Sequence, residues 1–109
     1  MNFMQIPLTS DPDQNFICTI PVDNKNITLK LRVRFNTAGN YWTLSIMDPK
    51  TGNSILDNIP LVTGTDILGQ YEYLNLGSAA IINVGNSTMD SPDSTNLGTD
   101  FILIWGNTL

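Results

Sequence analysis

The clearest pattern in the chain is a strict alternation of polar and apolar residues over positions 26–35. The apolar positions are Ile27, Leu29, Leu31, Val33 and Phe35, and the polar ones between them are Thr28, Lys30, Arg32 and Arg34. Successive side chains of a β-strand point to opposite faces, so this pattern predicts a long strand with one face in a core. The other face then carries a stripe of basic side chains, Lys30, Arg32 and Arg34, which we call the basic stripe.

Shorter apolar or alternating runs predict the remaining strands. They cover residues 16–21, 41–47, 54–59, 79–84 and 101–105, with a brief continuation at 61–62. The run 101–105, which includes Trp105, is apolar at every position. Such a run is typical of a strand that is covered on both faces, either by the core or by a partner.

The clearest turn lies at residues 48–53, between two of these strands. Pro49 presets φ near the start of the turn, and Gly52 can take the left-handed conformation that closes it. The turn therefore predicts a hairpin over residues 41–59. Trp42 lies at an inward position of the first strand of this hairpin, where an aromatic side chain usually belongs to the core.

Two other connections have readable signals. The link at residues 36–40 has the length of a hairpin loop, and Gly39 is able to take positive φ there. One helical turn is expected within residues 65–71, with Thr65 or Asp66 as its N-cap. This segment is too short for a stable helix of its own.

Short strands at this spacing predict an all-β fold, a small antiparallel sandwich or barrel of about seven strands. A chain of 109 residues can bury one core, so residues 1–109 are expected to form a single β domain. Within it, residues 1–15 are expected to be an extended lead-in with little regular pairing. Residues 85–100 are expected to be a long polar loop.

Charge is spread unevenly along the chain. The net charge is −5, and no Lys, Arg or His occurs after Lys50, whereas six acids fall in residues 51–109. An acidic chain is a poor candidate for nucleic acid, because that affinity rests on neutralising phosphates. No window approaches 18 apolar residues and residues 1–10 have no signal-peptide pattern, so we expect neither a membrane span nor secretion.

Catalytic and metal-binding chemistry is not expected. The chain has no His and a single Cys, Cys18, which lies in an apolar run and is expected to be a small core residue. Zinc sites and His-based triads therefore have no ligands to use. Asp90, Asp93 and Asp100 match no calcium-loop spacing, and the pattern places no pair of carboxylates in one cleft. We expect no enzyme activity, no cofactor and no metal site.

The candidates for function are surfaces. Lys30, Arg32 and Arg34 fit docking to an acidic protein surface, or else a solvated face whose charges are paired across strands. Asp90 and Asp93 lie in the 85–100 loop, which is either an interaction arm that orders on assembly or a simple surface loop. A sugar-stacking platform made of tyrosines with Trp42 is the further alternative.

Read in order, the segments resemble the small baseplate plug proteins of contractile-tailed bacteriophages and prophages, of the cyanophage type. The matching stretches are IPL at 6–8, NF at 15–16, RFN at 34–36, YWTLSIMD at 41–48, Gly52, PLVTGTDIL at 60–68 and NLG at 96–98, before the strand at 101–105. The resemblance covers about residues 5–105.

This resemblance implies a structural virion protein of the tail baseplate, made in the bacterial host cytoplasm and packed near the hub and spike. Its partners would be hub, spike or wedge proteins, or further copies of itself. The family has no catalytic residues to carry over, and the residues expected to be structural are Trp42, Pro49, Gly52, Gly98 and Trp105. A carbohydrate-binding or adhesin-like β-sandwich module is the alternative function.

Overall fold

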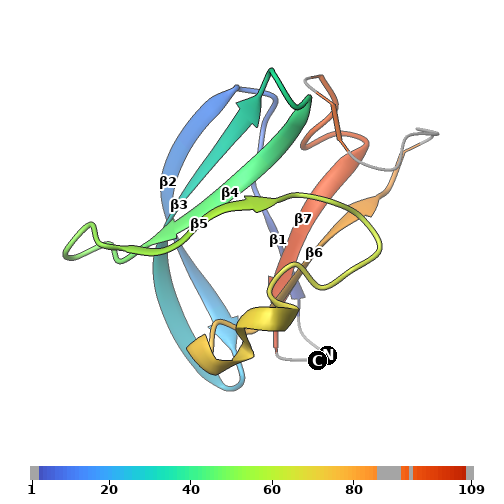
Figure 1. Cartoon of the computed structure of the whole chain (residues 1–109). Coiled ribbons are helices and arrows are strands. Elements are labelled where there is room, and N and C mark those ends of the chain that lie inside the picture. The colour runs from blue at the N-terminus through green and yellow to red at the C-terminus, as the bar shows by residue number, and fades with distance from the viewer. Residues whose placement is uncertain (1–2, 86–91, 94, 108–109) are drawn as a thin grey trace.

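The computed structural model describes residues 3–85, 92–93 and 95–107. In this part of the chain, antiparallel strands form two sheets (Figure 1). The seven strands are β1 (Phe3–Ile6), β2 (Asp13–Val22), β3 (Lys25–Asn36), β4 (Tyr41–Met47), β5 (Ser54–Pro60), β6 (Ser78–Asn83) and β7 (Phe101–Gly106). One 3-10 helix, η1, covers Gly69–Leu74. The predicted all-β class with antiparallel strands is confirmed.

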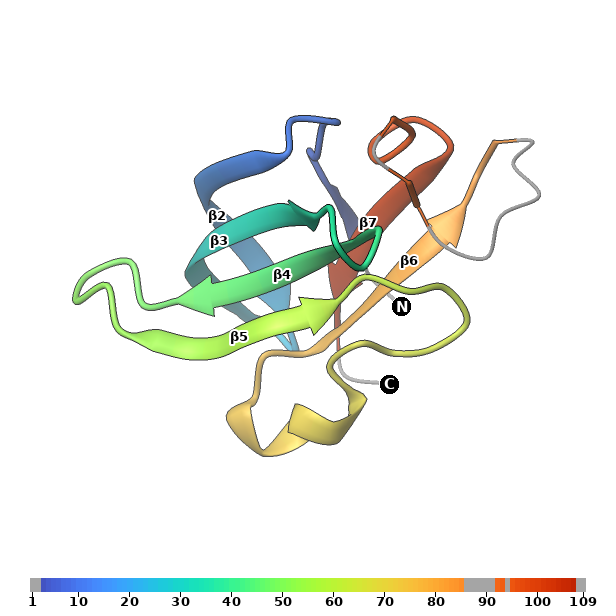
Figure 2. The ribbon, with the colours of Figure 1, turned by 45° about the horizontal axis from the view of Figure 1, so that its top comes forward.

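The strand order follows from the connections. Three consecutive hairpins build the four-stranded sheet β2-β3-β4-β5, whereas β7 lies at the centre of the three-stranded sheet β1-β7-β6. Figure 2 shows the hairpins of the larger sheet side by side, with β6 and β7 in a second layer. The register between β3 and β4 places Leu31 opposite Ile46 and Val33 opposite Leu44, so the apolar faces of the two strands coincide.

The core lies between the two sheets. From β3 it takes Leu29, Leu31 and Val33, all buried, while the basic stripe points to the opposite side. The largest buried side chains are those of Trp42 on β4 and Trp105 on β7, and both are fully buried. Phe35 packs edge-on against Trp42, with ring centroids 5.2 Å apart.

Each buried indole donates its N–H to a backbone carbonyl outside the strands. The Trp42 Nε1 atom lies 2.6 Å from the Asp93 carbonyl oxygen, and the Trp105 Nε1 atom lies 2.7 Å from that of Leu76. A buried polar group without a partner is costly, so these bonds are needed for the rings to be buried. They also attach the segment before β7 and the segment after η1 to the core.

The start of the chain differs from the expected lead-in with little pairing. Residues 3–6 form β1, which pairs along its length with β7, and β2 already begins at Asp13. Ile6 is almost completely buried, which explains why this short strand is held in place. Of the expected loop at 85–100, residues 86–91 and 94 lie outside the described residues.

The helical turn lies a few residues later than expected, at Gly69–Leu74. Asp66 precedes it and uses its carboxylate locally, because Oδ1 accepts from the backbone N–H of Leu68 at 3.0 Å and of Ala79 at 3.2 Å. The latter bond joins this segment to the start of β6. Asp66 therefore fixes the position of the turn from just outside it.

The link between β3 and β4 corrects one detail of the sequence reading. The residue with positive φ is Asn40, at 58°, and not Gly39. A glycine is needed at 39 for another reason, since a Cβ atom there would overlap the ring of Tyr41. In the β4–β5 turn, Gly52 does take positive φ, at 75°.

The strand β7 is covered on one of its two faces. Phe101, Leu103 and Trp105 are fully buried in the core, whereas Ile102 and Ile104 on the outward face are half-buried. The outward neighbour of Ile102 on β6 is Ile82, which is 36% exposed. The uniform apolar character of β7 thus leaves the outer side of the smaller sheet partly apolar.

Replacing Leu31 tests the assigned faces of β3. Leu31→Asp places a charge without a partner in the core, and we expect a loss of several kcal/mol from the roughly 5–15 kcal/mol that typically stabilises a domain. Thr28→Asp, on the exposed face of the same strand, should be tolerated. Thermal melts of the two variants check this, and equal tolerance would show that the faces are wrongly assigned.

Replacing Gly52 tests the turn. Nothing lies within 4 Å of a Cβ placed there, so the cost of Gly52→Val comes from the backbone alone and should be about 1–2 kcal/mol. Lys50→Ala in the same turn should cost almost nothing. Urea unfolding measures both, and a Gly52→Val variant as stable as the parent would contradict the required left-handed conformation.

Candidate interaction surface

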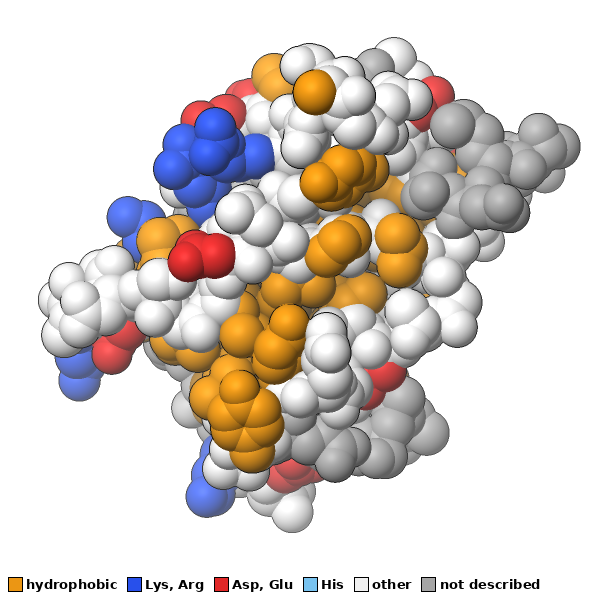
Figure 3. All heavy atoms as spheres, viewed as in Figure 1, with side chains coloured by type: hydrophobic (Ala, Val, Ile, Leu, Met, Phe, Trp, Pro, Cys, Tyr) orange, Lys and Arg blue, Asp and Glu red, His pale blue; other side chains and the backbone are white. Residues whose placement is uncertain are grey.

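The outward side of β2, β3 and β4 forms one continuous surface, which we call the basic face. Cross-strand register arranges it in rows, which are Asp13–Arg34–Thr43, Asn15–Arg32–Ser45 and Ile17–Lys30–Met47. Alternate residues of one strand are about 7 Å apart, so β3 spaces its three cations evenly down the middle. In Figure 3 basic side chains gather over β2 and β3, apart from the band of hydrophobic side chains across the centre.

One cation of the stripe is neutralised within the chain. Arg32 makes two contacts with the Asp13 carboxylate, from Nη2 to Oδ2 at 3.0 Å and from Nε to Oδ1 at 3.1 Å. This bonding lowers the pKa of Asp13 and raises that of Arg32, and the nearby Arg34 charge lowers the Asp13 pKa further. The side chains are 38% and 50% exposed, so water screens the pair and its net stabilisation is small.

The other two cations are not neutralised in this way. Neither Lys30 nor Arg34 forms an ion pair with a residue that the structure describes. Arg34 is exposed, and Lys30 is half-buried between Met47 and Ile17, whose side chain is 61% exposed. The expected pairing of charges across strands is therefore found for Arg32. Lys30 and Arg34, at the two ends of the stripe, remain available for a partner.

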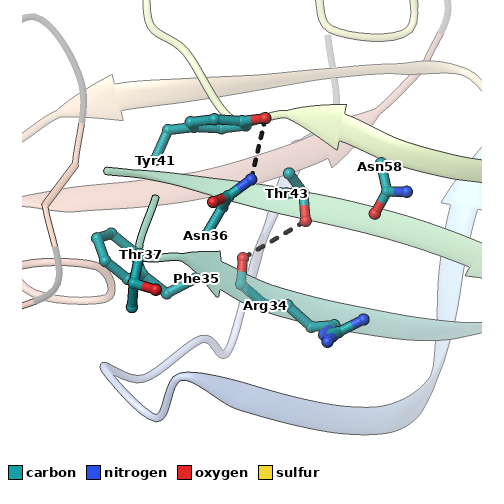
Figure 4. Close-up of a pocket in the computed structure, with 7 residues that line it drawn as sticks. All are labelled: Arg34, Phe35, Asn36, Thr37, Tyr41, Thr43 and Asn58. Atoms are coloured by element: carbon teal, nitrogen blue, oxygen red, sulfur yellow. Dashed lines mark hydrogen bonds between the residues drawn. The ribbon is translucent and has the colours of Figure 1, made fainter. Parts of the chain in front are cut away.

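An open hollow of about 420 Å³ lies at the Arg34 end of the basic face (Figure 4). Its lining residues are Arg34, Phe35, Asn36, Thr37, Tyr41, Thr43 and Asn58. Thr43 is the buried residue of this lining. Asn58 reaches it because β5 shifts register against β4 in this region and Asn58 takes positive φ, at 57°.

Sequence reasoning missed this hollow. The Asn36 side-chain amide positions Tyr41 in the wall of the hollow. Asn36 accepts the Gly39 N–H through Oδ1 at 3.0 Å and donates from Nδ2 to the Tyr41 hydroxyl at 3.3 Å. Asn36 stands three residues before Gly39 in a link that reads as a turn in the sequence, and nothing there shows that its side chain orients a tyrosine.

The acidic residues singled out in the sequence have different positions. The Asp93 carboxylate accepts hydrogen bonds from the backbone N–H and the hydroxyl of Thr95, at 2.8 and 2.7 Å, which lower its pKa. Its carbonyl holds Trp42, so Asp93 organises its own segment. Asp90 lies outside the described residues.

The residues expected to be structural lie in turns and in the core. Pro49 is half-buried in the β4–β5 turn. Gly98 takes positive φ, at 89°, and the Leu8 carbonyl oxygen lies where a Cβ of residue 98 would be. Gly98 therefore allows the chain before β7 to approach the segment after β1.

Other kinds of site find little support. Trp42 is fully buried and cannot stack on a sugar, while Tyr73 on η1 is 74% exposed. Cys18 is free and half-buried, and this burial raises its pKa. Among the described residues, no cluster of acidic, His or Cys side chains is suited to a metal ion. The same part of the chain contains no helix long and apolar enough to cross a membrane.

Comparison with known proteins identifies a family that the chain matches. The chain matches the family described as the cyanophage baseplate Pam3 plug gp18 over residues 3–108, which is nearly its whole length. No curated protein matches it.

The Asp13–Arg32 pair has a testable pH dependence. Arg32→Gln removes the bonding that lowers the Asp13 pKa, so the NMR titration midpoint of Asp13 should rise. Because the folded pKa is below the unfolded one, the stabilisation is present above the pKa of an unfolded Asp, about 3.9, and is lost as pH falls through the folded value. The gap in unfolding free energy between parent and variant should close over that range.

Lys30→Gln is the matched control for this titration, since it removes an equal charge that lies farther from Asp13 along β3. It should leave the Asp13 midpoint almost unchanged. An Asp13 midpoint that ignores Arg32→Gln, or that follows Lys30→Gln equally, would contradict a specific pair.

Proposed function

This chain belongs to the family of cyanophage baseplate plug proteins, and on that premise we propose that it is a structural part of a contractile tail that works through contacts with neighbouring baseplate proteins. The family is one of phage tail baseplate components and not a class of enzymes. Synthesis in the host cytoplasm followed by assembly into the virion is part of the proposal.

The observation that carries the proposal is the basic face. Lys30 and Arg34 form no ion pair with a described residue and lie on a rigid sheet surface, in a chain whose net charge is −5. Exposed charges that repel one another are relieved by an acidic partner, and complementary charge guides both the encounter and the register of two proteins. The exposed Ile17 beside Lys30 adds apolar area to the same surface.

A neighbouring baseplate protein is the partner that we propose for this surface, in preference to a second copy of the chain. A head-to-tail ring of copies would need the acids of residues 51–109 as a docking patch. Asp66 and Asp93 from that half already accept local hydrogen bonds with their carboxylates. We therefore propose a hub, spike or wedge protein as the partner.

The test is co-purification with the hub, spike and wedge proteins of the same tail gene cluster. Arg32→Glu/Arg34→Glu should lose the partner, and binding of the parent should weaken at high salt, because exposed charges are screened within about 8–10 Å at physiological ionic strength. Lys25→Glu/Lys50→Glu makes the same change of net charge at two exposed residues outside the basic face, the first residue of β3 and a residue of the β4–β5 turn, and should still bind.

Circular dichroism should first show that both double variants are folded. If the Arg32→Glu/Arg34→Glu protein folds and binds like the parent at low and high salt, the basic face is a solvated surface and the proposed contact is wrong. Loss of binding in both double variants would point to net charge alone and would also contradict it.

A further inference from the structure

The hollow beside Arg34 offers donors for an anion. The guanidinium of Arg34 points along it from β3, and the Asn58 amide lies across Thr43 on β5 (Figure 4). No Asp or Glu occurs among its described lining residues. Asp13 is opposite Arg34 in register and their charges interact, but both of its oxygens form their hydrogen bonds with Arg32. The hollow is therefore rich in donors and lacks an acid of its own.

Tyr41 adds a second donor through its orientation. Asn36 is fixed by the Gly39 N–H on its oxygen, which turns its NH₂ group toward the Tyr41 hydroxyl. The tyrosine oxygen thus accepts from Asn36, and its own O–H is left to donate. Gly39 leaves room for the ring in this position, since a Cβ atom there would overlap it. A guanidinium and a hydroxyl on one open surface are suited to a carboxylate.

We propose that this hollow receives an Asp or Glu side chain from the baseplate partner, with Arg34 as the ionic anchor and Tyr41 as the second donor. This inference rests on the proposed function and names its central contact. A hollow of about 420 Å³ accommodates an acidic side chain and the backbone next to it. Arg in a pocket within an interface is a typical residue of high binding energy.

The test is an ¹⁵N NMR titration of the whole protein with the capped peptide acetyl-Gly-Glu-Gly-amide. Saturable shifts should be confined to the amides of Arg34, Thr37, Tyr41 and Asn58 and to the Arg34 Nε–H. The matched acetyl-Gly-Gln-Gly-amide should bind at least about tenfold more weakly, because hydrogen bonds between charged groups are stronger than neutral ones.

Three variants distinguish binding of the peptide in the hollow from nonspecific electrostatic binding to basic side chains. Arg34→Gln should abolish saturable binding, and Tyr41→Phe, which keeps the ring but removes the O–H, should weaken it several-fold. Lys50→Gln removes an exposed charge in the β4–β5 turn, outside the hollow and the basic face, and should leave binding unchanged. The dispersion of each spectrum shows whether the variant is folded.

Equal shifts from the Glu and Gln peptides, or shifts spread equally over Lys25, Lys30 and Lys50, would overturn the inference. Co-purification distinguishes it from the proposed function. If Arg34→Gln alone keeps the baseplate partner while the double charge reversal loses it, the hollow is not the anchor and the basic face still is. If the peptide binds in the hollow but no baseplate protein binds the chain, the proposed function fails.

Discussion

Two buried indole rings determine how the irregular parts of this chain are held. An indole can be fully buried only if its N–H finds an acceptor, and neither ring finds one in a strand. Trp42 uses the carbonyl of Asp93, and Trp105 uses that of Leu76. The segment around Asp93 in turn holds its shape through bonds to Thr95 and Asn96. The same two hydrogen bonds therefore satisfy the buried rings and hold the two irregular segments against the core.

The spacing of the charges on the basic face is set by the sheet, because a rigid sheet does not let neighbouring charges move apart. The hairpins on either side of β3 fix its three cations at the spacing of the backbone. Among the described acids, only Asp13 forms an ion pair with one of these cations, and both of its oxygens bond to Arg32. The charge that stays available is therefore at the ends of the stripe, and at the Arg34 end it adjoins a hollow with a tyrosine hydroxyl.

Sequence periodicity predicted what depends on local pattern. The faces of β3, the hairpin over β4 and β5 and the left-handed Gly52 follow from neighbouring residues. The strand β1 was missed because four residues carry too little pattern, and its partner β7 lies at the other end of the chain. The hollow was missed because it depends on which residues face one another across strands, and on a register shift in β5 that no single segment reveals.

The placement of the tryptophans has a practical consequence. The chain has two of them, and each sheet holds one at full burial. Replacing either ring by phenylalanine therefore leaves one indole, whose intrinsic fluorescence reports on the surroundings of that ring alone. The emission of the remaining indole tells whether water has reached it, so comparing the two single-tryptophan variants shows whether the two rings are exposed together or in sequence when the protein unfolds.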